Sequence, residues 1–290
     1  MLTETFCHVP GYGPVKEKKL WASGTATWWD AMDHRHALIG AADGPLHKTI
    51  HECLKEYHEG FWELTASMLD RNDHWRGLCL SNPEGLVHPL RWLALDIETT
   101  GLDPVNGQVT AIGLCGHATG FAPVALVADH DNWASELPRL MADSDVLITF
   151  NGRSFDVPFM ARSMQHMALI FPPFHVDLCI ILRKLGVRGG LKRIQKRLGF
   201  RRDAGLEEVS GMTAIRLWAE HQKGTPGARE TLVRYCLEDV VVLFDLACWA
   251  YNQAALHLNR QWQCWQPPAV SLHELPYDPM LVKRLVGRWK

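Results

Sequence analysis

The sequence predicts an α/β protein with a mixed β-sheet flanked by helices and a mainly helical N-terminal extension. Short apolar runs bounded by turn residues gather between residues 91 and 150, as strands do. Helical periodicity dominates after residue 155 and also governs the first 90 residues. Three strands that precede alternating helix and strand are typical of a sheet with both antiparallel and parallel pairs.

The composition is that of a folded protein with a substantial core. The 290 residues are 47% hydrophobic and 21% charged, and no apolar run has the length of a membrane span. The eight cysteines include no Cys-x-x-Cys pair, and the first residues lack a signal-peptide layout. We therefore expect a cytoplasmic protein with reduced thiols and no membrane partner; no protein partner can be inferred. Because the net charge is −2, any contact with nucleic acid needs a local basic patch.

Residues 1–90 form the predicted helical region, and residues 6–22 within it resemble a helix-hairpin-helix segment. A Gly11-x-Gly13 turn is followed by Pro14 and a lysine-rich helix. In that motif, backbone N–H groups of the turn contact a DNA phosphate, so Gly11 and Gly13 are possible phosphate contacts. A plain glycine turn that caps a surface helix explains the same residues.

Residues 91–252 carry the predicted sheet. We expect strands at residues 92–98, 109–115, 121–127 and 145–150, and helices at residues 132–141, 155–168, 178–186, 191–198, 206–221 and 228–252. The short turns between the first three strands favour hairpins. The fourth strand follows a helix and is therefore the first that can pair in parallel with the first strand. Residues 253–290 are expected to form a tail packed on this body.

Asp96 and Glu98 lie two residues apart in the first predicted strand, so their side chains point to the same face. Two carboxylates held that close repel each other and raise each other's pKa. A divalent cation between them removes the repulsion, and hard cations such as Mg²⁺ prefer oxygen ligands. An exposed edge strand explains an isolated Asp-x-Glu equally simply, so the interpretation depends on partners elsewhere in the chain.

Three later segments supply such partners, and one of them is Asp177 at the start of a predicted helix. Asn151 and Asp156 follow a buried strand through a glycine turn, and Asp156 begins a predicted helix. Tyr235 and Asp239 are four residues apart in a strongly helical stretch, so they share one helix face.

Together these segments resemble the three exonuclease motifs of the DEDD superfamily. Asp-x-Glu with Thr-Thr-Gly-Leu, then Asn-x-x-x-Phe-Asp, then Tyr-x-x-x-Asp follow in the order of that family. The tyrosine four residues before the last aspartate marks the DEDDy branch. Segments at residues 174–178, 190–199 and 211–218 resemble the bacterial YprB-type ribonuclease H-like proteins, although Cys236 replaces the asparagine that is common after the tyrosine. The resemblance implies a ribonuclease H-like fold.

The resemblance also implies a 3′–5′ exonuclease that uses two Mg²⁺ or Mn²⁺ ions. Asp96 would bind both ions, Glu98 and Asp239 the ion that carries the attacking water, and Asp156 the second ion. Tyr235 would orient the water. Two ions can clamp the scissile phosphate and stabilise both the attacking and the leaving oxygen. The expected substrate is a single-stranded 3′ end of DNA or RNA.

The contacts with nucleic acid are expected at two places. The resemblance puts Thr99, Thr100, Leu102 and Asn151 near the terminal nucleotide. The predicted helix at residues 191–198 carries a basic face opposite its apolar one, and its basic residues are Lys192, Arg193, Lys196 and Arg197. Such a face either follows phosphates or is simply solvated.

Two other functions stay open at this point. A non-catalytic nucleic-acid-binding or scaffold protein could keep the same fold, although all four carboxylates and the tyrosine are present. A structure-specific endonuclease could use the same residues.

Overall fold

The computed structural model describes residues 2–33, 44–78, 90–129, 133–167, 169–200, 202, 204–260, 262, 270, 272 and 274–287. The contacts between Cα atoms divide the chain into two units. The first unit comprises Met1–Leu90, Pro173–Val176 and Tyr251–Trp265. The second unit comprises Arg91–Pro172, Asp177–Ala250 and Gln266–Lys290.

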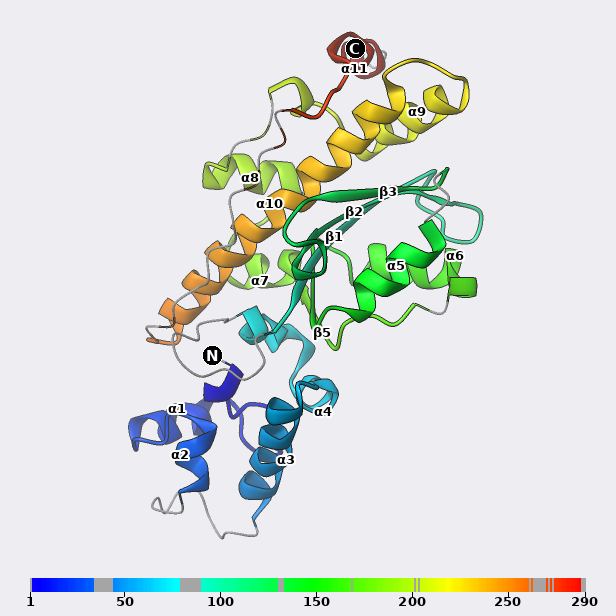
Figure 1. The fold of residues 1–290 in the computed structure, drawn as a ribbon. Helices are drawn as coiled ribbons and strands as arrows, with labels where there is room; N and C mark the ends of the chain where they lie inside the picture. Colours follow the sequence, from blue (N-terminus) through cyan, green and yellow to red (C-terminus); the bar gives the residue numbers. More distant parts are fainter. Residues whose placement is uncertain are drawn as a thin grey trace. The chain divides into compact units, whose positions relative to one another are not determined.

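The chain forms one five-stranded sheet in the order β3-β2-β1-β4-β5 (Figure 1). The strands are β1 Trp92–Thr99, β2 Val109–Gly116, β3 Val124–Val127, β4 Val146–Thr149 and β5 Phe174–Asp177. Strand β1 pairs antiparallel with β2 and parallel with β4, and β2 pairs antiparallel with β3. The predicted mixed sheet is confirmed.

Two strands differ from the prediction. β3 begins at Val124 rather than at residue 121, because Gly120 and Phe121 adopt left-handed φ angles of 60° and 62° that end the preceding turn. β5 was not predicted, since its four residues are too short to show strand periodicity against the prolines before it.

Helices cover both faces of this sheet. The helices that follow β3 are α5 Trp133–Ala142, α6 Asp156–Ser163, α7 Leu178–Lys184, α8 Leu191–Leu198, α9 Gly211–Gln222, α10 Ala228–His257 and α11 Pro279–Val286. α9 begins at residue 211 rather than 206, because Ser210 and Thr213 form a capping box there. Residues 132 and 168, which bound two predicted helices, lie outside the described residues.

Alternate residues of β1 face different helices. Leu93, Leu95 and Ile97 are buried in a core cluster with apolar residues of α5 and α6. Because side chains alternate along a strand, Asp96 and Glu98 point to the opposite face, which α10 covers. The alternation therefore directs both carboxylates toward the helix that carries Asp239.

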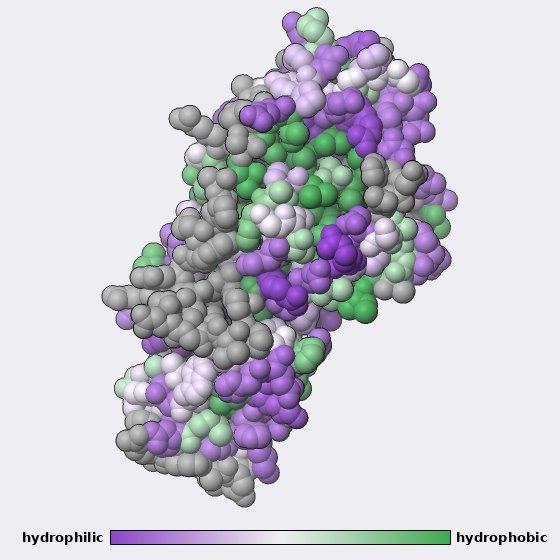
Figure 2. Space-filling view, in the orientation of Figure 1, coloured by the Kyte–Doolittle hydropathy of each residue, from purple (hydrophilic) through white to green (hydrophobic). Residues whose placement is uncertain are grey.

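A second core cluster lies on the α10 side of the sheet. Leu217 of α9, Leu232 of α10 and Leu281 of α11 are buried in it. α11 therefore packs its apolar face on the second unit, where it contacts α9. Figure 2 shows further apolar side chains gathered over the sheet of this unit. One edge strand of the sheet, β3, is only four residues long. A short edge limits pairing with other chains.

The first unit contains the predicted helical region. Its N-terminal elements are the 3-10 turn η1 Leu2–Glu4, the helices α1 Pro14–Ala22, α2 Trp28–Met32, α3 Pro45–Glu59 and α4 Glu63–Met68, and the 3-10 helix η2 Arg71–Leu78. A buried ion pair at 2.9 Å joins Glu17 of α1 to Arg76. The second oxygen of Glu17 accepts hydrogen bonds from the Thr5 hydroxyl and the Phe6 N–H, both at 2.7 Å. These bonds tie the first residues to α1.

The segment before the glycine turn of the first unit differs from that of a helix-hairpin-helix motif. Gly11 adopts a left-handed φ of 80°, and Gly13 is the residue before the first turn of α1. The segment before the turn forms only η1 rather than an α-helix. The phosphate contact at Gly11 and Gly13 stays a prediction.

The described part of the chain contains no helix with both the length and the apolarity to cross a membrane. Its cysteines are free thiols: Cys7, Cys53, Cys115, Cys179, Cys236 and Cys248.

Candidate active site

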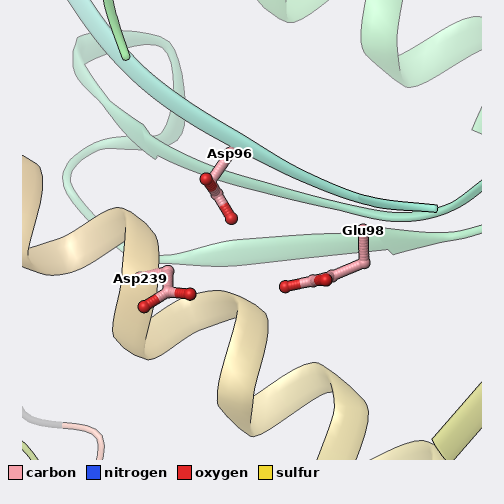
Figure 3. A group of neighbouring side chains, drawn as sticks. All are labelled: Asp96, Glu98 and Asp239. Atoms are coloured by element: carbon pink, nitrogen blue, oxygen red, sulfur yellow. The ribbon is translucent and has the colours of Figure 1, made fainter. Parts of the chain in front are cut away.

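Three carboxylates meet between β1 and α10. One oxygen of Asp96, one of Glu98 and one of Asp239 all lie within 4.8 Å of one another. Figure 3 shows Asp96 and Glu98 projecting from β1 toward α10, from which Asp239 faces them. Glu98 and Asp239 are only 6% and 5% exposed, and Asp96 is half-buried. The group brings three carboxyl groups together in a site with little access to water.

A glycine of β2 allows α10 to come this close. Gly113 pairs with Asp96 in the antiparallel ladder. A Cβ atom at Gly113 would lie 3.0 Å from both the carbonyl oxygen and the Sγ of Cys236 on α10. Any larger residue would push α10 away from the sheet. The close approach therefore sets the distance between Asp239 and the two carboxylates of β1.

The carboxylates line a cavity of about 320 Å³. It is lined by the predicted residues Asp96, Glu98, Thr99, Leu102, Asn151, Asp156, Tyr235 and Asp239, and also by Ile97, Phe150, Phe155, Leu191, Gly211, Met212 and Ile215. Asp156 is not within the group of three. Its Oδ1 accepts a hydrogen bond of 3.1 Å from the Ile97 N–H between Asp96 and Glu98. All five predicted catalytic residues therefore face one cavity.

The loop before α6 is held by a single carboxylate. Asp177 accepts hydrogen bonds from the N–H groups of Asn151 at 2.8 Å and Arg153 at 3.1 Å. Asn151 adopts a left-handed φ of 66°, which asparagine tolerates better than most residues. A Cβ atom at Gly152 would lie 2.3 Å from the Thr149 hydroxyl. This tight turn brings β4 to the start of α6 and so places Asp156.

The segment after Glu98 has only part of its predicted residues at the cavity. Thr99 and Leu102 line it, and Leu102 is 82% exposed. Thr100 does not line it; its N–H and hydroxyl hydrogen-bond to the backbone of Gln108 at 2.9 Å. Thr100 therefore closes the turn after β1.

Burial governs the acidity of the cluster. The pKa of Asp96 is raised to about 7, because burial disfavours the charged carboxylate more than nearby cations favour it. The pKa values of Glu98 and Asp156 are raised well above their ordinary range by burial and then by the charge of Asp96. Burial also raises the pKa of Tyr235, with further contributions from Glu98 and Asp96. The site favours protonation unless positive charge is supplied.

Two cations lie next to this cluster. The Arg202 guanidinium forms an ion pair with Asp239, a contact that the sequence did not predict. The ammonium of Lys192 lies 4.5 Å from the centre of the Tyr235 ring. Burial lowers the pKa of Lys192 to about 7. The only signal for Arg202 in the sequence is its place in the basic run after Asp177, which does not distinguish it from its neighbours.

The predicted basic face of α8 lies on a second, larger cavity of about 760 Å³. Lys192, Arg193 and Lys196 line this cavity together with Arg202. Arg197 is exposed and is not part of its lining. Ile194 is buried on the other face of α8, as the amphipathic pattern predicts.

The residues of the first cavity fit divalent cations. Carboxylate oxygens are the ligands that Mg²⁺ and Mn²⁺ prefer, and three of them already lie within 4.8 Å of one another. The ion pair between Arg202 and Asp239 shows that the cluster attracts positive charge. Among the described residues, this is the only group of three or more possible metal ligands that lie this close together.

Comparison with known proteins identifies the fold family. A model of the RNase_H superfamily (RNase_H_2) matches residues 93–251, more than half of the chain. The chain belongs to the RNase_H superfamily. The matched range includes every carboxylate of the site as well as Tyr235, Lys192 and Arg202.

Among solved structures, the RNase_H superfamily chain is similar to the family B DNA polymerase of the hyperthermophilic archaeon Pyrobaculum calidifontis. The TM-score is 0.45 with 20% sequence identity, over 60% of this chain and 25% of the polymerase. The chain thus spans about a quarter of the length of that polymerase. A search of curated proteins gave no match.

Proposed function

We propose that the second unit is a metal-dependent 3′–5′ exonuclease of the DEDDy type that acts on single-stranded ends of DNA or RNA. One observation carries the proposal: Asp96, Glu98 and Asp239 converge within 4.8 Å, and Asp156 and Tyr235 line the same cavity. This combination of four carboxylates and a tyrosine suits hydrolysis of a phosphodiester.

The carboxylates hold the metals. Asp96 would bind both Mg²⁺ or Mn²⁺ ions, Glu98 and Asp239 would bind the ion that carries the attacking water, and Asp156 would bind the second ion. When bound, such ions neutralise charge on the scissile phosphate and lower the pKa of water. Their positive charge would also offset the burial that raises the pKa values of Asp96, Glu98 and Asp156, and the charge of Asp96 that raises the latter two further.

Tyr235 positions the attacking water through its hydroxyl. Its side chain is 4% exposed, and burial raises its pKa above the ordinary value for tyrosine. The phenol therefore stays protonated near neutral pH and acts by hydrogen bonding rather than as a base. The surrounding core fixes the ring, because Tyr235 packs in the second core cluster, which α9, α10 and α11 form.

The cavity suits one terminal nucleotide rather than a duplex. Its volume of about 320 Å³ is at the lower end of the range for small-ligand sites. Leu102 and Met212 are 82% and 57% exposed at its lining, which leaves apolar surface for a base. Thr99 and Asn151 supply polar groups on the same lining. The basic face of α8 accepts the phosphates that follow.

The test is hydrolysis of a 5′-labelled oligonucleotide, with DNA and RNA assayed side by side. With Mg²⁺ or Mn²⁺ we expect stepwise shortening that EDTA stops and that Asp239→Asn abolishes. The matched control is Asp143→Asn, which changes an aspartate in the turn after α5 whose side chain is 52% exposed. Intact DNA and RNA with every metal would instead support a scaffold function, and a discrete internal fragment would support an endonuclease.

A further inference from the structure

Arg202 is a buried arginine at the edge of the carboxylate cluster. Its side chain is 4% exposed, and its Nη2 donates to Oδ1 of Asp239. Its Nε donates to the side-chain oxygen of Gln195 on α8 at 3.2 Å. Its guanidinium carbon is 5.8 Å from the centre of the Tyr235 ring. Arg202 thus touches one proposed metal ligand and lies beside the residue that positions water.

One hydrogen-bond donor of the Arg202 guanidinium has no partner among the described residues. Nη1 of Arg202 is buried and has no hydrogen-bond acceptor among the described residues. The buried ammonium of Lys192, beside the same tyrosine, has no acceptor there either. Buried donors are usually paired, because an unpaired one loses its hydration without compensation. Two such donors next to a carboxylate cluster indicate a place for an anion.

The ion pair with Asp239 is incompatible with a metal on the same oxygen. A divalent ion and a guanidinium carry charge of the same sign, so both cannot occupy the Oδ1 of Asp239. When the ion binds, Nη2 loses its partner, while Gln195 still holds Nε. The guanidinium then has two free donors, Nη1 and Nη2, next to the reacting centre.

An arginine with two free donors matches a phosphate. The planar guanidinium binds two oxygens of a phosphate at once and keeps its charge at every pH of interest. A purely structural ion pair is the alternative, but such a pair would leave Nη1 buried without a function. Arg202 also lines the second cavity, whose lining carries the basic residues Lys192, Arg193 and Lys196 and the acidic residues Glu207 and Glu208, so phosphates bound by the basic residues would lie near Arg202.

We propose that Arg202 is a further catalytic residue of the exonuclease, paired with Asp239 in the metal-free protein and bound to the non-bridging oxygens of the scissile phosphate when metal occupies Asp239. This inference rests on the proposed function. In the reaction the water oxygen bonds to phosphorus and the bond from phosphorus to O3′ breaks. The proton lost by water goes to solvent, and O3′ takes one up as it leaves. Arg202 keeps all its protons and stabilises the charge that builds on the phosphate.

The two roles of Arg202 predict opposite effects of its removal. In Arg202→Gln the metal no longer competes with a cation, so Mn²⁺ binding without nucleic acid tightens by about tenfold or more. The single-turnover rate at saturating Mn²⁺ falls by about 100-fold, as when one donor to a transition-state oxygen is lost. Free Mn²⁺ is measured by electron paramagnetic resonance and the rate by rapid quench. A structural role would weaken both.

Two further variants keep the test decisive. Arg202→Lys keeps the positive charge but cannot bind two phosphate oxygens at once as a guanidinium does. We therefore expect Mn²⁺ affinity near that of the wild type and an intermediate rate. Arg139→Gln removes an arginine of α5 whose side chain is 55% exposed, and we expect neither value to change. Circular dichroism and urea unfolding establish that each variant is folded.

The outcomes separate this inference from the proposed function. A wild-type protein that hydrolyses nothing overturns the proposed function itself. An active wild type with Arg202→Gln that binds Mn²⁺ no more tightly, or that cleaves as fast, overturns only the role of Arg202. Tighter Mn²⁺ binding together with slower cleavage supports it.

Discussion

The buried charge of Asp96 leads to a prediction about stability. Burial raises the pKa of Asp96 from 3.8 to about 7, so the metal-free folded protein pays for ionising this group whereas the unfolded chain does not. A group whose pKa is raised on folding binds more protons in the folded state. The free energy of unfolding therefore falls as the pH rises from about 4 to 7. Asp96→Asn removes this dependence of the free energy of unfolding on pH.

The size of the effect follows from the pKa. At 1.36 kcal/mol for each factor of ten, a change from 3.8 to about 7 corresponds to as much as about 4 kcal/mol at pH 8. At pH 4 the same change contributes only about 0.5 kcal/mol, because pH 4 lies just above the unfolded-state pKa of 3.8 and the two states have only begun to differ in bound protons. The variant should therefore gain stability over the wild type mainly above pH 5.

Urea unfolding in EDTA at pH 4, 6 and 8 measures this gain for Asp96→Asn. The control is Asp143→Asn, in the exposed turn after α5, for which we expect no gain that depends on pH. An Asp96→Asn protein that is less stable than the wild type at pH 8 would refute the reasoning. An equal gain at pH 4 and pH 8 would also refute it, because a buried charge cannot produce that result.

Three other predictions concern the same unit. Mg²⁺ should raise the urea midpoint of the wild type at pH 8 but not that of Asp96→Asn, because an ion that binds only the folded state stabilises it; equal shifts would exclude binding at this site. The affinity for Mn²⁺ without nucleic acid should rise through about pH 7, because Asp96 must lose its proton to bind the ion; an affinity that falls between pH 5.5 and 8.5 would be inconsistent with this. Gly152→Ala should cost about 1–3 kcal/mol in urea unfolding, since the new Cβ would lie 2.3 Å from the Thr149 hydroxyl, whereas Gly101→Ala, with no atom within 4 Å of its Cβ, should cost less; equal costs would contradict the steric argument.

The sequence contains the local part of this site. Asp96 and Glu98 share a face because strand side chains alternate, and Tyr235 and Asp239 share one because helix residues four apart do. Both rules need only neighbouring residues, so they hold without knowledge of the fold. The mixed sheet was predictable for a similar reason, since turn residues separate its strands.

What could not be predicted depends on contacts between distant segments. Arg202 pairs with Asp239 across 37 residues of chain, and one basic run offers nine candidates for such a contact. Gly113 reads as an ordinary strand residue until α10 is seen packed against it. The bonds of Thr100 to Gln108 in the turn were not predicted either, and its contact with the nucleotide stays a prediction. A motif identifies these residues but not their partners.

The order in which nucleotides leave a single-stranded oligonucleotide tests the central claim most directly. The same strand is labelled at its 5′ end or at its 3′ end and incubated with Mg²⁺. We predict that the 3′ label appears at once as a mononucleotide, while the 5′ label moves through a descending ladder. Release of the 5′ label first, or of internal fragments from both labelled samples, would contradict a 3′–5′ exonuclease at this site.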